Sequence, residues 1–289
     1  SIVRILMSFK SSYNKNWKKL MILPVLILVI SLGILGNNYS NFGDFIEKDV
    51  SLKGGYSITV ETDEEFSTLD LEKQLGDDVA VKKLKSIATG GALGYTLDYG
   101  GDDVDSFLSE IKSLFEVTEY SIEEISPAIS QRFWEGTLKA ITMALIAMSF
   151  VIFLYFRKVV PAAAIVLSGV SNIIGTLAAM SLLGISLSAS GIAAILMLLG
   201  YSIDSNIVLT ARVLKNKRDS LEDRITSAVK TGLTMSVTSI VALLVLYLTS
   251  TAAILKIISL TLIIGLLLDV LNTWIQNAGI LRLYLGDKK

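Results

Sequence analysis

The chain of 289 residues contains no cysteine and no histidine. Without cysteine, disulfide bonds and thiolate-bound metal centres are excluded. Without histidine, the chain lacks the commonest metal ligand and the side chain that titrates most readily near neutral pH. We therefore expect no metal site and no cofactor. Any proton chemistry must use carboxylates, with lysine as the remaining partner.

Charged residues are also scarce, at 18% of the chain against 52% hydrophobic residues, and the mean hydropathy is +0.61. These values exclude a disordered chain and exceed the usual apolar share of a soluble domain. The charge is uneven. Residues 37–133 hold 20 acidic and 8 basic residues, a net charge of −12, whereas the remainder has a net charge of +11. An acidic soluble domain therefore interrupts a basic membrane protein.

Motifs of common enzyme and cofactor sites are absent from the sequence. There is no P-loop for ATP and no EF-hand spacing for calcium. The acidic region has no obvious catalytic cluster, and its carboxylates are more typical of a solvated face. We expect no catalytic residues, no enzyme activity and no nucleic-acid partner.

Six apolar stretches are long enough to cross a hydrocarbon core about 30 Å thick, which needs roughly 20 residues. They are 17–36, 137–156, 159–183, 187–210, 227–249 and 254–280. The first follows a basic segment and lacks a small-residue cleavage site, which predicts an uncleaved span. Core helices of a soluble protein are the alternative, but so many long and nearly uncharged runs argue against it. We predict an integral membrane protein.

The basic residues of the terminal segments and of the short loops between spans fall on one side of a six-span arrangement. They are Lys10, Lys15, Lys18, Lys19, Arg157, Lys158, Arg212, Lys215, Lys217, Arg218, Arg224, Arg282, Lys288 and Lys289. By the positive-inside rule, the N-terminus (1–16), the loop 211–226 and the C-terminus (281–289) are cytoplasmic. Region 37–136 then lies outside, where the glycosylation triplet at Asn38 is permitted, although such triplets are common by chance.

The outer region alternates between strand and helix patterns. Segments 56–61, 79–87, 92–98 and 120–125 are strand-like, segments 64–75 and 102–115 have helical spacing, and residues 89–91 form a turn. The order β-α-β-β-α-β predicts an α+β ferredoxin-like domain between the first and second spans.

Asp204 is the most unusual residue, because it lies inside an otherwise apolar span. Burying an ionised Asp at bilayer depth costs roughly 3 kcal/mol or more. Such a residue indicates proton or ion handling, or a buried charge pair. The plain alternative is a polar group that only hydrogen-bonds a neighbouring helix.

Asp204, Lys230 and Asp269 are predicted to share one layer of the bundle. By the helical rise, Asp204 lies about 12 Å from the cytoplasmic end of its span, Lys230 lies a comparable distance beyond Arg224, and Asp269 lies roughly 20 Å from Arg282. Polar neighbours that could hold water or relay protons are Ser202, Ser205, Asn206, Thr231, Thr234, Asn272 and Thr273. Two alternatives stay open: Lys230 can extend its stem to the interface, and Asp269 can be a helix–helix hydrogen-bond partner.

Four segments together resemble the SecD/SecF protein-export family. They are LGYSIDSNIVLTAR (199–212), DVSLKGG (49–55), KTGLT (230–234) and DVLNTWIQNAGIL (269–281). The six-span plan with a large loop after the first span is also similar, so the resemblance covers nearly the whole chain. Archaeal members are the most similar in the last of these segments.

The resemblance implies an accessory subunit that pairs with SecD in a twelve-span complex similar to half of an RND exporter. Such a complex associates with a SecYEG-type translocon and uses proton or sodium flux to promote export of a translocating polypeptide across the cell membrane. The resemblance implies that Asp204 and Lys230 are the residues that couple ion flux to export. Two residues depart from the family pattern: bacterial members carry the acid one place later, at the position of Ser205, and commonly have arginine in place of Lys230.

The sequence leaves three alternative functions. A passive scaffold of the translocon would need no ion coupling. A small-solute RND-type exporter usually has twelve spans and a larger outer domain. An intramembrane aspartyl protease using Asp204 and Asp269 would carry Tyr-Asp and Gly-x-Gly-Asp, whereas these acids follow Ile203 and Leu268.

Overall fold

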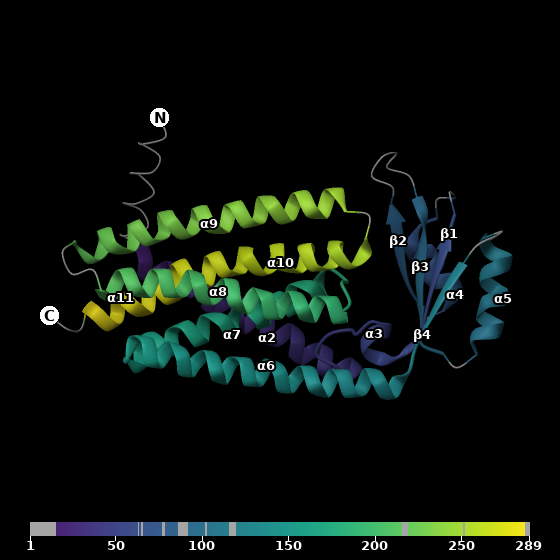
Figure 1. The fold of residues 1–289 in the computed structure, drawn as a ribbon, viewed down its shortest axis with the longest axis horizontal. Helices are drawn as coiled ribbons and strands as arrows, with labels where there is room; N and C mark the ends of the chain where they lie inside the picture. Colours follow the sequence, from purple (N-terminus) through teal and green to yellow (C-terminus); the bar gives the residue numbers. More distant parts are fainter. Residues whose placement is uncertain are drawn as a thin grey trace.

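The computed structural model describes residues 16–62, 64, 66–76, 79–85, 92–101, 103–115, 120–215, 219–250 and 252–286. The predictions for the N-terminus before residue 16, for the turn at 89–91 and for the tail after residue 286 lie outside these residues. The described part has an elongated helical bundle with a small α+β domain at one end (Figure 1).

Among the described residues, six helical segments are long and apolar enough to cross a membrane. They are Asn16–Asn41, Pro127–Phe156 (α6), Val159–Leu182 (α7), Ala189–Lys215 (α8), Leu221–Thr249 (α9) and Ile254–Gly286. The first overlaps helix α2, which is Ile22–Phe42. The last comprises α10 (Ala253–Leu271), a π-helix η1 (Asn272–Asn277) and α11 (Ala278–Gly286). The predicted six-span membrane fold is confirmed.

Helix α6 begins ten residues before the predicted second span. Ser126 has an extended backbone, and Pro127 occupies the first turn of the helix. A proline is favoured there because its fixed φ suits a helix and its missing N–H would have had no partner. The polar residues before residue 137 therefore continue the span out of the membrane as a helix instead of belonging to the outer domain.

The outer domain is a four-stranded antiparallel sheet in the order β2-β3-β1-β4. The strands are β1 (Gly55–Glu61), β2 (Val79–Lys85), β3 (Ala92–Tyr99) and β4 (Tyr120–Ile125), and the helices are α4 (Thr68–Leu75) and α5 (Val104–Phe115). This order and connectivity are those of the predicted ferredoxin-like fold.

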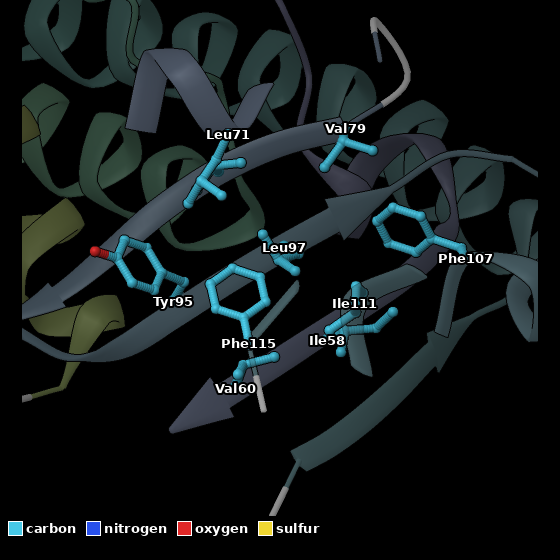
Figure 2. Packing of buried hydrophobic residues seen from close by; sticks show 10 residues of the cluster. Ile58, Val60, Leu71, Val79, Tyr95, Leu97, Phe107, Ile111 and Phe115 are labelled. Atoms are coloured by element: carbon cyan, nitrogen blue, oxygen red, sulfur yellow. The ribbon is translucent and has the colours of Figure 1, made fainter. Parts of the chain in front are cut away.

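Alternation along the strands separates an apolar face from a polar face of the sheet. Ile58, Val60, Tyr95 and Leu97 point toward Phe107, Ile111 and Phe115 of the helical side, as Figure 2 shows. Helix α4 begins at Thr68, four residues later than predicted. The cause is Tyr95, whose hydroxyl oxygen accepts a hydrogen bond from the backbone N–H of Phe66 (2.7 Å) and so fixes the preceding segment in a non-helical form.

The polar face of the sheet looks toward the spans. Ser57 donates a hydrogen bond to Asp98 there (2.8 Å). A hollow of about 460 Å³ separates this face from the outer ends of the helices, where Tyr247 and Lys256 line it. The domain is therefore attached to the spans mainly through its chain connections.

The segment 47–55 forms the joint between the two parts. Asp49 caps the short helix α3 (Val50–Lys53), accepting a hydrogen bond from the N–H of Ser51 (3.0 Å). The backbone N–H of Asp49 donates to the carbonyl of Leu187 (2.9 Å), just before α8. The hydroxyl of Ser51 accepts from the N–H of Ala189, the first residue of α8 (2.9 Å). The motif at 49–55 thus ties the outer domain to the start of α8.

Candidate functional site

A polar cluster lies between α7, α8 and η1, inside the otherwise apolar bundle. Its centre is Asp269 near the end of α10, whose side chain is 0% exposed. The carboxylate oxygen Oδ1 accepts hydrogen bonds from the hydroxyl of Ser202 (2.6 Å), the hydroxyl of Thr273 (3.0 Å) and the amide of Asn172 (3.2 Å). Three helices therefore contribute donors to one carboxylate oxygen.

Asn206 extends this cluster by one helical turn of α8. Its amide nitrogen donates to the carbonyl of Ser202 (2.7 Å) and to the hydroxyl of Thr273 (3.0 Å). Its amide oxygen accepts from Asn277 (2.5 Å). The name Asp269 cluster is used below for Asp269, Asn172, Ser202, Asn206, Thr273 and Asn277.

The π-helix η1 brings polar side chains to two different neighbours. Gln276 donates to the hydroxyl of Ser171 in α7 (3.4 Å), while Asn277 reaches Asn206 in α8. A π-helix has a wider turn than an α-helix, is rare, and is found frequently at functional sites. The irregular geometry therefore marks this part of the last span as a candidate site.

Sequence reasoning identified Ser202, Asn206, Asn272 and Asp269 as members of one polar layer, and the structure places all four in the buried region between the helices. It missed Asn172, Ser168, Gln276 and Asn277. The available signal was that each is a polar residue within an apolar span, and Asn172 is the sole amide side chain of its span.

Asp204 and Lys230 lie elsewhere. Both side chains are exposed on the outside of the bundle, on α8 and α9, and no hydrogen bond joins either side chain to another described residue. Helical spacing explains the position of Asp204: residues 202 and 206 share the inward face, and residue 204 is rotated by about 200° from residue 202. The structure does not bring Asp204, Lys230 and Asp269 together.

The remaining predicted polar residues bind backbone carbonyls one turn earlier, and the side chain of Ser205 also lies beside the Asp269 carboxylate. Ser205 is buried, and its hydroxyl donates to the carbonyl of Tyr201 (3.0 Å). Thr231 and Thr234 donate to carbonyls one turn earlier in α9, at Ser227 (3.3 Å) and Lys230 (2.9 Å). Within the described part of the chain, no group of three or more Asp or Glu side chains is placed to hold a metal ion.

Asp204 belongs to an exposed stripe along α8. Its members are spaced by three or four residues and so lie on one helix face. They are Ala193, Met197, Gly200, Tyr201 and Asp204, called the α8 stripe below. In a bilayer, this stripe faces lipid or another protein.

Gly232 in α9 is required by the packing of the π-helix. A methyl group there would overlap the six-membered ring of Trp274. We expect Gly232→Ala to push α9 away from η1 and to lower the free energy of unfolding by about 1–3 kcal/mol, the usual cost of overpacking. Thermal unfolding of the purified chain in detergent measures this. Gly200→Ala is the matched control, because nothing lies within 4 Å of that position; equal unfolding temperatures for the two variants would contradict the prediction.

Known proteins match this chain over most of its length. Residues 104–287 match a family model described as "Protein export membrane protein SecD/SecF, C-terminal". The SecF protein-export membrane protein of Pyrococcus furiosus is 39% identical over 275 residues, which cover 94% of this chain and 92% of the relative. The chain belongs to the SecD/SecF protein-export family. The family expected from the sequence motifs is thereby confirmed, and the chain is a multi-pass membrane protein.

Further comparisons agree with this assignment. SecF of Methanocaldococcus jannaschii is also 39% identical, over 94% of this chain and 97% of the relative. Among solved structures, the translocon-associated SecDF of Thermus thermophilus has a similar fold, with a TM-score of 0.75 at 16% identity. That similarity covers 94% of this chain but 38% of the longer SecDF chain. A heavy-metal efflux pump is similar over 69% of this chain, with a TM-score of 0.50, so the fold is shared with such pumps.

Proposed function

We propose that this chain is an accessory subunit of the Sec protein translocase, which acts with SecD and uses proton or sodium flux to promote export of polypeptides across the cell membrane. The close relatives are named for protein export. The solved SecDF chain is more than twice as long, and this chain corresponds in fold to 38% of it. SecD is the partner that would supply the rest.

The observation that carries this proposal is the outward position of Asp204. A charged side chain at the centre of a spanning helix costs about 2.5–3.5 kcal/mol on insertion scales. The described residues of this chain give Asp204 no hydrogen-bond or ion-pair partner, and Lys230 has none either. A second membrane protein placed over the α8 stripe would provide polar groups for Asp204, so we assign this stripe to the contact with SecD.

In this arrangement, binding of a cation to Asp204 switches the contact between the two subunits. The neutral carboxyl group no longer needs a charged partner, and α8 is free to change its packing against SecD. The outer end of α8 is hydrogen-bonded to Ser51 and, through Leu187, to Asp49. A movement of α8 would thus pass through the joint at 47–55 to the outer domain.

Both termini are proposed to be cytoplasmic. Arg157, Arg212 and Arg224 lie near the end of α6, the end of α8 and the start of α9. These helix ends are remote from the outer domain (Figure 1). Because basic residues favour the cytoplasmic side, the outer domain would lie outside. There it would meet a polypeptide leaving a SecYEG-type channel.

Site-specific photocross-linking in membranes that contain SecD tests the assigned contact. A photoreactive amino acid at Tyr201, which is 41% exposed on the α8 stripe, is expected to cross-link to SecD. The same amino acid at Phe150, which is 62% exposed on α6, is the control and is expected to label lipid. If Tyr201 labels lipid alone while SecD is present, the contact is assigned to the wrong face.

A further inference from the structure

Three buried oxygen atoms of the last span have no hydrogen-bond donor in the described structure. They are Oδ2 of Asp269, Oε1 of Gln276 and Oδ1 of Asn277. All three are acceptors, and buried acceptors without donors are rare in folded proteins because each one loses its interaction with water. One of the three, Oδ2 of Asp269, belongs to the one carboxylate that is buried within the described spans, and a positive species would satisfy it.

Within the described ranges, no cationic side chain forms an ion pair with Asp269. Helix α7 contains no ionisable residue. The ionisable groups of the other neighbours point elsewhere: Tyr201 and Asp204 of α8 and Lys230 of α9 are exposed. The side chain of Arg282, in α11, lies over the ring of Trp17 (5.7 Å). An ionised carboxylate buried without a cation costs several kcal/mol, so Asp269 needs another source of positive charge.

The protein already supplies a prepared environment for such a charge. Three donors bind Oδ1 of Asp269, whereas Oδ2 has no hydrogen-bond partner among the described residues. The π-helix turns the amides of Gln276 and Asn277 toward α7 and α8. A carboxylate oxygen is a suitable ligand for a hard cation and also takes up a proton.

We propose that the Asp269 cluster binds a small monovalent cation, a proton or a sodium ion, on the free oxygen of Asp269. This site lies within a single chain and is separate from Asp204. Two of its members, Ser202 and Asn206, are on the inward face of α8, directly behind Asp204. Occupancy of the site therefore acts on the position of α8. Only this last step, the coupling to export, rests on the proposed function; cation binding itself does not.

Infrared difference spectroscopy of the purified chain in lipid nanodiscs tests the proposal. Lowering the pH in choline chloride is expected to produce the carbonyl band of a protonated carboxylic acid. The other carboxyl groups of the chain contribute in every variant, and the part of the band that belongs to Asp269 persists in Asp204→Asn and is missing in Asp269→Asn. Sodium chloride at constant pH suppresses the band if sodium shares the site, and leaves it unchanged if the site takes protons alone. Identical spectra for the wild-type chain and Asp269→Asn, with acid and with sodium, would overturn the proposal.

A second variant covers the case in which Asp269→Asn does not fold. Thr273→Val keeps the side-chain shape and removes one donor to Oδ1 of Asp269. The carbonyl band is expected to move to higher frequency without being lost, because its oxygen accepts one hydrogen bond fewer. An unmoved band would assign the signal to another carboxyl group and refute the site. If the band changes as expected but protein export does not depend on the ion gradient, the proposed function is wrong and the cation site is still supported.

Discussion

Replacing Asp204 with asparagine is expected to make protein export independent of the ion gradient. The substitution keeps the shape of the side chain and removes its ability to bind a proton or a cation. Because coupling between two sites is typically worth 1–3 kcal/mol, the gradient-driven part of export should fall by a factor of roughly 5 to 150. Asp204 has no hydrogen-bond or ion-pair partner within the described chain, so folding should be unaffected.

Export of a secreted protein into vesicles that contain the translocon and SecD, with and without an imposed gradient, measures this effect. Met197→Leu is the matched control, because it changes the same α8 stripe without a charge. Asp204→Glu keeps the carboxylate and is expected to retain part of the gradient dependence. If Asp204→Asn responds to the gradient as the wild type does, this chain is a passive scaffold of the translocon.

Replacing Gly54 with alanine is expected to detach the outer domain from the spans. The residue has φ of 86°, which is unfavourable for any residue with a side chain. A methyl group there would also lie 2.5 Å from Cα of Pro127 and 2.7 Å from its backbone nitrogen, at the start of α6. Backbone strain and overpacking each cost about 1–3 kcal/mol. Their combination is a large share of the 5–15 kcal/mol that stabilise a typical protein.

Gly76 provides a closely matched control for the strain alone. It follows α4 with φ of 97° and ψ of 172°, close to the 86° and 167° of Gly54, but nothing lies within 4 Å of an added methyl group. We expect Gly54→Ala to unfold at a clearly lower temperature than Gly76→Ala, and to be cleaved faster by protease at the joint. Equal behaviour of the two variants would show that contact with Pro127 does not hold the joint.

The fold was predictable because its signals are local. Alternation in Tyr56–Glu61 and helical spacing in Val104–Phe115 each place apolar side chains on one face, and the structure buries those faces together. The start of α4 was not predictable from spacing, because the hydroxyl of Tyr95, far along the chain, fixes the segment before it. Local patterns therefore indicate the elements, and distant contacts decide where some of them begin.

The sequence predicted how deep the site residues lie along their spans, but not which side of α8 faces the interior of the bundle. The helical rise places Asp204 and Asp269 at depths that can be estimated from the sequence. Spacing also shows that Asp204 lies opposite Ser202 and Asn206. It does not show which of the two faces is inside, because both carry polar groups. The π-helix hides the contribution of Asn277, because its turn departs from the period on which helical predictions depend.

The central claim is that Asp204 handles a cation at a contact with SecD. Ion flux into vesicles that contain SecD and this chain, followed with a pH-sensitive or sodium-sensitive dye under an imposed gradient, tests it most directly. The account predicts flux with the wild-type chain and with Met197→Leu, and flux reduced to that of vesicles without the complex for Asp204→Asn. Equal flux for the wild-type chain and Asp204→Asn would contradict the account.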